Sequence, residues 1–234
     1  MISENINLVR KLIHRKCKDC NRDPSEVKLI AVSKNFGVEK IEEAYSEGLR
    51  EFGENRAQEL NLKFDNLGNK IVWHFIGRLQ KNKAKYVVKT ADYIHSIDSL
   101  QLAEEVNKRA GNINKVQKVL VEVKTSVEQS KAGVENESNV FKISEFCSDA
   151  ENLELLGLMT IAPLTDDEKL IRQSFSYLRN LRGRLNDSGF EKIKELSMGM
   201  TSDFETAIEE GATMLRIGSA IFGERNYSKD WKEI

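Results

Sequence analysis

The chain has 234 residues, of which 40% are hydrophobic, and its 36 Lys and Arg nearly balance 37 Asp and Glu. This length suffices for one sizeable core, and no Ser-, Gly- or Pro-rich linker interrupts it, so we predict a single domain over residues 1–234. A net charge of −1 gives no overall attraction to nucleic acid or to an anionic membrane. No apolar run approaches the roughly 20 residues of a membrane span, and the N-terminus has no signal-peptide pattern. We expect a cytoplasmic monomer without nucleic-acid or membrane partners.

Three cysteines, an odd number, argue against a disulfide framework. Cys17 and Cys20 form a CxxC pair, but a zinc site would need a second pair of ligands at suitable spacing, which the sequence lacks. The pair also lies at the end of the first amphipathic segment, whereas a redox motif would open a helix after a strand. We interpret it as incidental.

The chain begins with an amphipathic helix over residues 3–20, where apolar side chains recur at helical spacing. Pro24 ends this leading helix (1–21), because the residue before a proline avoids the α region, and we expect the helix to pack on the rest of the fold. Short apolar strands then alternate with amphipathic helices. The predicted strands are 28–33, 50–53, 72–77, 93–97, 118–124, 153–159, 195–198 and 213–217. The predicted helices are 38–48, 55–67, 81–89, 99–110, 138–150, 166–186, 202–210 and a short one over 219–222.

Eight strand–helix units imply parallel pairing, because parallel neighbours need a crossover and a helix is the usual one. Eight such units close naturally into a (β/α)₈ barrel of the TIM type. An open doubly wound sheet is the competing arrangement. No GxGxxG or P-loop motif follows any predicted strand, which favours the barrel.

Ligand chemistry in such a barrel collects at the C-terminal ends of the strands. Lys34 directly follows the first strand, where loss of hydration lowers a lysine pKa and makes the amine nucleophilic toward a carbonyl. An ordinary solvated lysine is the alternative. The neighbouring strand ends decide between these two interpretations.

A phosphate site is predicted at the last two strand ends. The eighth strand carries Arg216, ends in Gly218 and Ser219, and turns into a short helix whose first amides can bind an anion. The seventh strand ends at Ser197, and residues 197–202 offer further hydroxyl and amide donors. Barrels frequently bind phosphate in these two loops. A nucleophilic lysine and a phosphate site in one barrel mouth suggest a phosphorylated aldehyde, of which pyridoxal 5′-phosphate (PLP) is the commonest cofactor.

The sequence also resembles the PLP homeostasis protein family, which shares the PLP-binding barrel of alanine racemase. The matching segments run in order along nearly the whole chain. They are LIAVSK (29–34), EFGENRAQEL (51–60), WHFIGRLQKNKAKYV (73–87), IHSIDS (94–99), SKAGV (130–134), GLMTIAP (157–163), LSMGMTSDFETAI (196–208) and RIGSAIFGER (216–225).

The resemblance implies a role for each matching position. Lys34 would form the Schiff base, Arg216 would lie near the pyridine nitrogen, and the phosphate contacts would come from Ser197, Gly218 and Ser219. Asn55 and His74 match polar positions that face the barrel mouth. The chain departs from the family pattern at Lys124, where asparagine is common, and at Phe36, where a second basic residue often stands. No role is assigned to Lys124 or Lys131.

The expected partner of the pyridine nitrogen bears on the chemistry. A carboxylate would keep this nitrogen protonated and make PLP a strong electron sink, whereas an arginine stays charged and cannot accept the proton. Arg216 therefore suits simple carriage or racemase-like chemistry better than decarboxylation or transamination. His74 and His95 are best interpreted as satisfied polar residues. The lysines of segment 81–89 are best interpreted as a solvated face.

Three functions are consistent with these features. The favoured one is a non-enzymatic PLP carrier that buffers the cofactor and supplies apo PLP-dependent enzymes. An amino-acid racemase is the main alternative, but it needs an acid/base group on each face of the substrate carbanion. We expect no residues beyond the barrel for the extra domain that supplies the second group in alanine racemases. A sugar-phosphate aldolase using Lys34 fits the chemistry and leaves the family resemblance unexplained.

Overall fold

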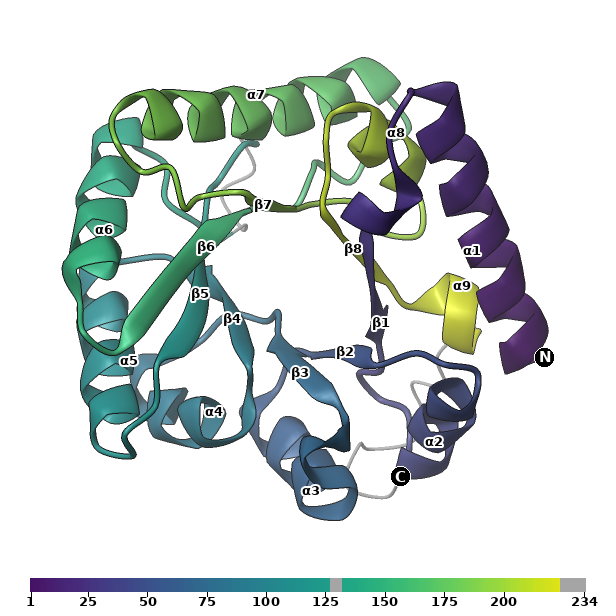
Figure 1. Ribbon diagram of the computed structural model, residues 1–234, viewed down its shortest axis with the longest axis horizontal. Helices are drawn as coiled ribbons and strands as arrows, with labels where there is room; N and C mark the ends of the chain where they lie inside the picture. The colour runs from purple at the N-terminus through teal and green to yellow at the C-terminus, as the bar shows by residue number, and fades with distance from the viewer. Residues whose placement is uncertain (127–131, 224–234) are drawn as a thin grey trace.

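The strands form a closed parallel barrel in which each pairs with its sequence neighbours and β8 pairs with β1 (Figure 1). The structure, a computed structural model, describes residues 1–126 and 132–223. The strands are β1 Lys28–Val32, β2 Glu51–Glu54, β3 Val72–Phe75, β4 Tyr93–Ile97, β5 Gln117–Glu122, β6 Leu153–Met159, β7 Glu195–Ser197 and β8 Met214–Ile217. The predicted (β/α)₈ barrel is confirmed.

The helices surround this barrel, as Figure 1 shows. They are α1 Ile2–Asp19, α2 Val38–Ser46, α3 Ala57–Leu67, α4 Ala84–Thr90, α5 Leu100–Gly111, α6 Glu137–Asp149, α7 Glu168–Asp187, α8 Phe204–Glu209 and α9 Ser219–Phe222. Short 3₁₀ turns occupy Pro24–Glu26, Gly68–Lys70 and Lys81–Lys83. The helix predicted over 81–89 is therefore a 3₁₀ turn followed by the shorter α4.

Two predicted boundaries are wrong in ways that affect the barrel mouth. Helix α3 begins at Ala57 and not at Asn55, because Arg56 is still extended at φ −125° and ψ 127°. Strand β5 ends at Glu122 and not at Lys124, because the chain beyond it pairs with the loop at Val134. Asn55 and Glu122 consequently lie at strand ends.

Side chains alternate between the outer helix layer and the barrel interior, as period-2 strands in a closed barrel require. Phe52, Trp73 and Phe75 belong to the large cluster that includes the helices. A separate small cluster fills part of the interior with side chains from β1, β5, β6 and β8, namely Ile30, Leu120, Met159 and Met214. The inward positions of the remaining strands include buried polar residues, among them His74, His95 and Ser197.

Helix α1 packs beside α8 and α9 (Figure 1). Its buried stripe consists of Ile2, Ile6, Val9, Ile13 and Cys17. Asn5 Nδ2 also donates a hydrogen bond to the Ile221 carbonyl oxygen of α9 (3.0 Å). Because α9 directly follows Gly218, the leading helix supports the loop predicted to bind phosphate.

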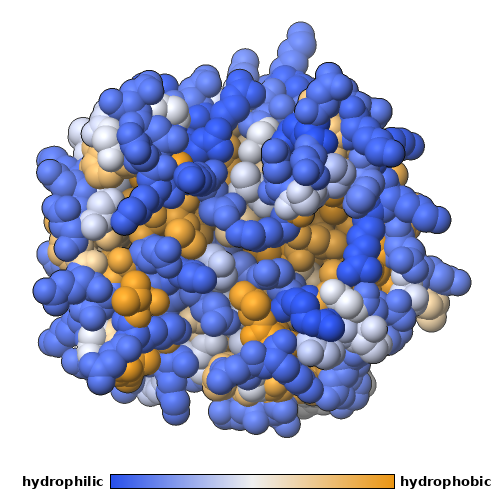
Figure 2. Space-filling view, viewed as in Figure 1, coloured by the Kyte–Doolittle hydropathy of each residue, from blue (hydrophilic) through white to orange (hydrophobic). Residues whose placement is uncertain are grey.

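The surface around the barrel opening is mainly hydrophilic, with separate hydrophobic areas and no single continuous patch on this face (Figure 2). Within residues 1–126 and 132–223, no helix is long and apolar enough to cross a bilayer. Cys17, Cys20 and Cys147 are free thiols. The same residues contain no group of three or more His, Cys, Asp or Glu that could hold a metal ion.

Candidate functional site

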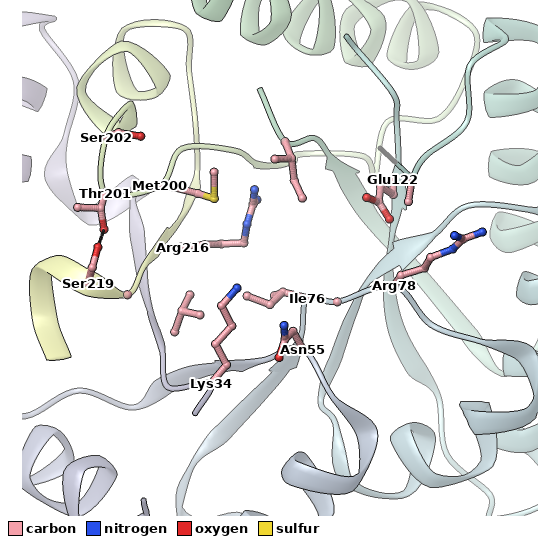
Figure 3. A pocket seen from close by; sticks show the side chains of 15 residues that line it. Lys34, Asn55, Ile76, Arg78, Glu122, Met200, Thr201, Ser202, Arg216 and Ser219 are labelled. Atoms are coloured by element: carbon pink, nitrogen blue, oxygen red, sulfur yellow. Dashed lines mark hydrogen bonds between the residues drawn. The ribbon is translucent and has the colours of Figure 1, made fainter. Parts of the chain in front are cut away.

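A cavity of about 620 Å³ opens at the C-terminal ends of the strands, and its size is typical of a small-molecule site. Residues at or after the ends of seven of the eight strands, all except β4, line it, and Figure 3 shows their side chains around the cavity. The lining residues are Val32, Lys34, Asn55, Ile76, Gly77, Arg78, Glu122, Ala132, Ile161, Met200, Thr201, Ser202, Arg216, Gly218 and Ser219.

Five of the seven residues predicted for the site line this cavity: Lys34, Asn55, Arg216, Gly218 and Ser219. In Figure 3 the Lys34 side chain points into the middle of the cavity. Thr201, Ser202 and Ser219 lie on one side of it, and Arg78 and Glu122 lie on the other. The chain thus brings a lysine amine, a group of hydroxyls and an arginine together around one space.

The turn that carries Lys34 is anchored by a buried ionic cluster. Lys63 Nζ donates to Glu54 Oε1 (2.7 Å), to Glu59 Oε1 (2.7 Å) and to the Ser33 carbonyl oxygen (2.8 Å). Ser33 Oγ also donates to Glu54 Oε1 (2.6 Å), and the Asn35 amide donates to Glu59 Oε1 (2.6 Å). The residues on both sides of Lys34 are therefore fixed by hydrogen bonds to charged groups.

Burial raises the pKa of Glu54 to about 7, the Lys63 ammonium opposes this shift, and Glu59 adds to it. Removing one member of a buried ion cluster leaves an uncompensated charge, which is strongly destabilising. This cluster is why the backbone around Lys34 has a defined position although it lies in a loop.

The loops after β7 and β8 meet beside Lys34. Ser219 Oγ lies 3.3 Å from Thr201 Oγ1, and the Ala220 amide lies 3.5 Å from the same oxygen. Gly199 has a φ of +94°, and a Cβ there would lie 2.6 Å from the Ala207 Cβ. The close turn therefore requires glycine. It presents hydroxyl and amide donors that can bind an anion.

Arg216 lies on the floor of the cavity and is 4% exposed. Its Nη1 donates to Ser197 Oγ (2.7 Å), and its Nη2 donates to the Thr160 carbonyl oxygen (2.9 Å). Burial lowers the pKa of Arg216 to about 10, with Asp203 and Glu122 opposing the shift. The guanidinium is therefore still a cation at neutral pH, and its orientation is fixed from below.

Ser197 and His74 lie beneath the cavity and not on its wall. Both are fully buried: Ser197 Oγ contacts Arg216 and His95, and His74 lies between His95 and Glu51. His74 is not among the residues that line the cavity, and its expected contact with the cofactor stays a prediction. A direct ligand contact by Ser197 stays a prediction, and the geometry gives this residue an indirect position.

The two departures from the family pattern also lie outside the cavity lining. Lys124 Nζ pairs with Glu135 Oε1 (2.5 Å), and the Phe36 ring packs on Phe222 at a centroid distance of 5.1 Å. Lys131 lies outside the described residues. Asn55 Oδ1 is buried and has no hydrogen-bond partner within the described part of the chain, so this pocket-lining residue has an acceptor available to a ligand.

Glu122 and Arg78 are pocket residues whose importance the sequence did not reveal. Burial raises the pKa of Glu122 to about 7, Asp98 adds to the shift, and Arg216 and Arg78 oppose it. The alternation along β5, with Lys118 and Leu120 facing inward, was the signal that could have identified Glu122. The predicted strand end at Lys124 obscured it.

Comparisons with known proteins agree with this geometry. The alanine racemase N-terminal domain family matches residues 2–226. A curated relative from Aquifex aeolicus, named pyridoxal phosphate homeostasis protein, is 44% identical over 96% of this chain and 98% of its own. The solved structure of PipY from Synechococcus elongatus with PLP bound is 35% identical, covers 95% of this chain and 100% of its own, and superposes with a TM-score of 0.84.

Alanine racemase from Clostridium difficile shares the fold at 17% identity and a TM-score of 0.75, over 94% of this chain and 57% of its own. The racemase is thus similar to this chain over little more than half of its length. By the family match and by nearly full-length relatives, the chain belongs to the pyridoxal phosphate homeostasis protein family, within the alanine racemase N-terminal domain fold.

Proposed function

We propose that this protein binds PLP as a Schiff base on Lys34 and carries it without robust catalytic turnover. The observation that supports this most is the Lys34 amine pointing into a cavity with hydroxyl and amide donors on one side and a buried arginine below (Figure 3). PLP supplies an aldehyde for the amine and a phosphate dianion for the donors. The relatives' name and the PLP-bound PipY structure support the same assignment.

The residues present fit this cofactor. Ser219, Gly218 and Thr201 would hold the phosphate with hydroxyl and amide donors, and Arg216 would supply a fixed cation to the pyridine nitrogen. Because a charged arginine cannot take up a proton, a PLP ring bound beside Arg216 would be a weak electron sink. The Ser33 and Asn35 contacts keep the lysine in place during binding and release.

A carrier role follows from what surrounds Lys34. Among residues 1–126 and 132–223, no tyrosine lines the cavity, and Tyr93 stacks on His74 below it at a centroid distance of 4.5 Å. Tyr227 lies outside the described residues. A racemase needs a second acid/base group opposite the lysine, for which Glu122 is the titratable candidate on the cavity wall, so we favour the carrier on the homeostasis name of the relatives. We therefore assign the protein to buffering PLP and supplying it to apo PLP-dependent enzymes.

Titration with PLP tests this function. The wild-type protein should develop the near-violet absorbance of a Schiff base at a stoichiometry of one, and Lys34→Ala should not. Lys40→Ala is the matched control, since Lys40 lies on α2 outside the cavity lining and is half exposed. A Lys34→Ala protein that keeps the absorbance would contradict the assignment.

A further inference from the structure

A continuous hydrogen-bond chain runs through the barrel from its lower end to Arg216. Glu51 Oε2 is 2.5 Å from His74 Nε2, His74 Nδ1 is 2.8 Å from His95 Nε2, and His95 Nδ1 is 2.8 Å from Ser197 Oγ. Arg216 Nη1 completes the chain by donating to Ser197 Oγ (2.7 Å). Glu51 is the first residue of β2, at the end opposite the cavity, and its side chain is 28% exposed.

The chain crosses the barrel from one wall to the other. His74 and His95 stand on the neighbouring strands β3 and β4, whereas Ser197 and Arg216 stand on β7 and β8. Both imidazoles and the Ser197 hydroxyl are fully buried. A buried polar network of this kind is stabilising only when each member is satisfied, because an unpaired group in a low dielectric costs free energy.

One direction of donation along the chain gives every member a partner. Burial lowers the pKa of His95 well below its ordinary value, with His74, Arg216 and Lys28 adding to the shift, so His95 is neutral and has one N–H. Arg216 can only donate, so it donates to Ser197. A hydroxyl oxygen can accept two hydrogen bonds, and we assign the Ser197 hydrogen to His95 Nδ1 because this direction gives that hydrogen an acceptor. His95 consequently donates from Nε2 to His74 Nδ1, and His74 donates from Nε2 to the Glu51 carboxylate. A cation stands at one end and an anion at the other.

We infer that Glu51, His74, His95 and Ser197 are positioning residues that hold Arg216 in the orientation the cofactor ring requires. This inference rests on the proposed function, since Arg216 acts there on the pyridine nitrogen. The chain fixes the guanidinium plane from below, together with the Thr160 carbonyl oxygen. Ser197, which does not line the cavity, thereby acts on the site through Arg216.

The first test needs no cofactor. In apo protein labelled with ¹⁵N-histidine, NMR should show His74 and His95 both protonated at Nε2, and His95 Nδ1 should show the shift of a hydrogen-bonded acceptor. In Ser197→Ala that nitrogen should move toward the value of a free imine nitrogen. A proton on His95 Nδ1 in the wild-type protein would overturn the chain whether or not PLP binds.

The second test measures PLP affinity and the absorbance maximum of the loaded protein. Ser197→Ala should weaken PLP binding by about tenfold and shift the absorbance maximum, because Arg216 loses one of its hydrogen-bond acceptors. Ser144→Ala is the matched control, since Ser144 on α6 is equally buried and its hydroxyl has no partner within the described residues. Wild-type affinity and spectrum in Ser197→Ala would overturn the positioning role, whereas absence of PLP binding by the wild-type protein would contradict the proposed function alone.

A double-mutant cycle separates transmission through the chain from general destabilisation. Glu51→Gln keeps an acceptor oxygen and removes the charge. We expect it to weaken PLP binding by several-fold and to shift the absorbance maximum less than Ser197→Ala does. The exposed Glu154→Gln, at the same end of the barrel on β6, should have no effect. In the Ser197→Ala background the Glu51 effect should disappear. An unchanged Glu51 effect in that background would overturn the inference.

Discussion

Gly77 shows how tightly the cavity wall is packed at the residue scale. A Cβ at this position would lie 2.2 Å from the Asn55 carbonyl oxygen, so the loop after β3 can approach the Asn55 backbone only without a side chain. Asn55 lines the same cavity, and its Oδ1 has no hydrogen-bond partner within residues 1–126 and 132–223. The polar groups of the site are therefore placed by close backbone packing as well as by their own hydrogen bonds.

The phosphate assignment predicts a difference between two ligands. Gly218→Val should weaken the binding of PLP by about a hundredfold and that of pyridoxal by less than about threefold. The reason is that only PLP carries the dianion that we assign to the Gly218–Ser219 segment. Isothermal titration of both ligands measures this. Gly183→Val is a control on α7, where a Cβ would meet nothing within 4 Å. Equal losses for the two ligands would show that these loops do not bind phosphate.

Glu122 predicts the pH dependence of stability. Its pKa is about 7 in the folded protein against an ordinary value of 4.5, so the folded state binds more protons than the unfolded chain between these values. The contribution of Glu122 to stability therefore falls as pH rises through this window, by on the order of 3 kcal/mol at most.

Glu122→Gln cannot lose a proton and escapes this fall. Relative to the wild-type protein, the apo variant should be more stable at about pH 8 than at about pH 5, as measured by urea denaturation at both values. The exposed Glu151→Gln, in the loop before β6, should show no such difference. A pH-independent effect of Glu122→Gln would mean that Glu122 is ionised throughout.

At the scale of elements, the order of strands and helices could be predicted from the periodicity of apolar residues. The exact ends of the elements at the barrel mouth could not. The alternation of short apolar runs with amphipathic segments predicted each strand and the closed barrel. It did not show that Arg56 stays extended or that the chain after Glu122 pairs with Val134, because both depend on contacts between distant segments. The same limit applies to the buried chain from Glu51 to Arg216, whose members come from five strands.

Helix α1 predicts a contrast between its two faces. Ile6 is fully buried against the barrel helices, and Leu8 is 57% exposed. Ile6→Ala should cost about 2–5 kcal/mol of unfolding free energy because it leaves a cavity, whereas Leu8→Ala should cost less than about 0.5 kcal/mol. Thermal and urea unfolding measure both. Similar losses would show that α1 does not pack as described.

At the scale of the whole molecule, the described residues form one barrel with a cavity at the C-terminal ends of its strands. The carrier assignment predicts that PLP-loaded protein racemises L-alanine and other L-amino acids at rates near those of free PLP. A chiral assay measures this, with the Lys34→Ala protein as the blank. Turnover in the usual enzymatic range of about 1–10³ s⁻¹ would support a racemase and require a second base.

Lys34 and the loops beside it were identified from the sequence because strand ends and a family resemblance point to them directly. The residues that hold them in place were not, since Lys63, Glu59 and His95 act through contacts that only the folded chain creates. The cavity wall thus consists of residues that sequence patterns reveal, on supporting residues that these patterns do not reveal.

The most direct test of the central claim is to trap the cofactor on its lysine. Borohydride reduction of the PLP-loaded protein, followed by proteolysis and mass spectrometry, should place the pyridoxyl group on Lys34 at close to one per chain. Under the same conditions Lys34→Ala should carry only scattered labelling at substoichiometric levels. Stoichiometric labelling of another lysine, with Lys34 unmodified, would contradict the account.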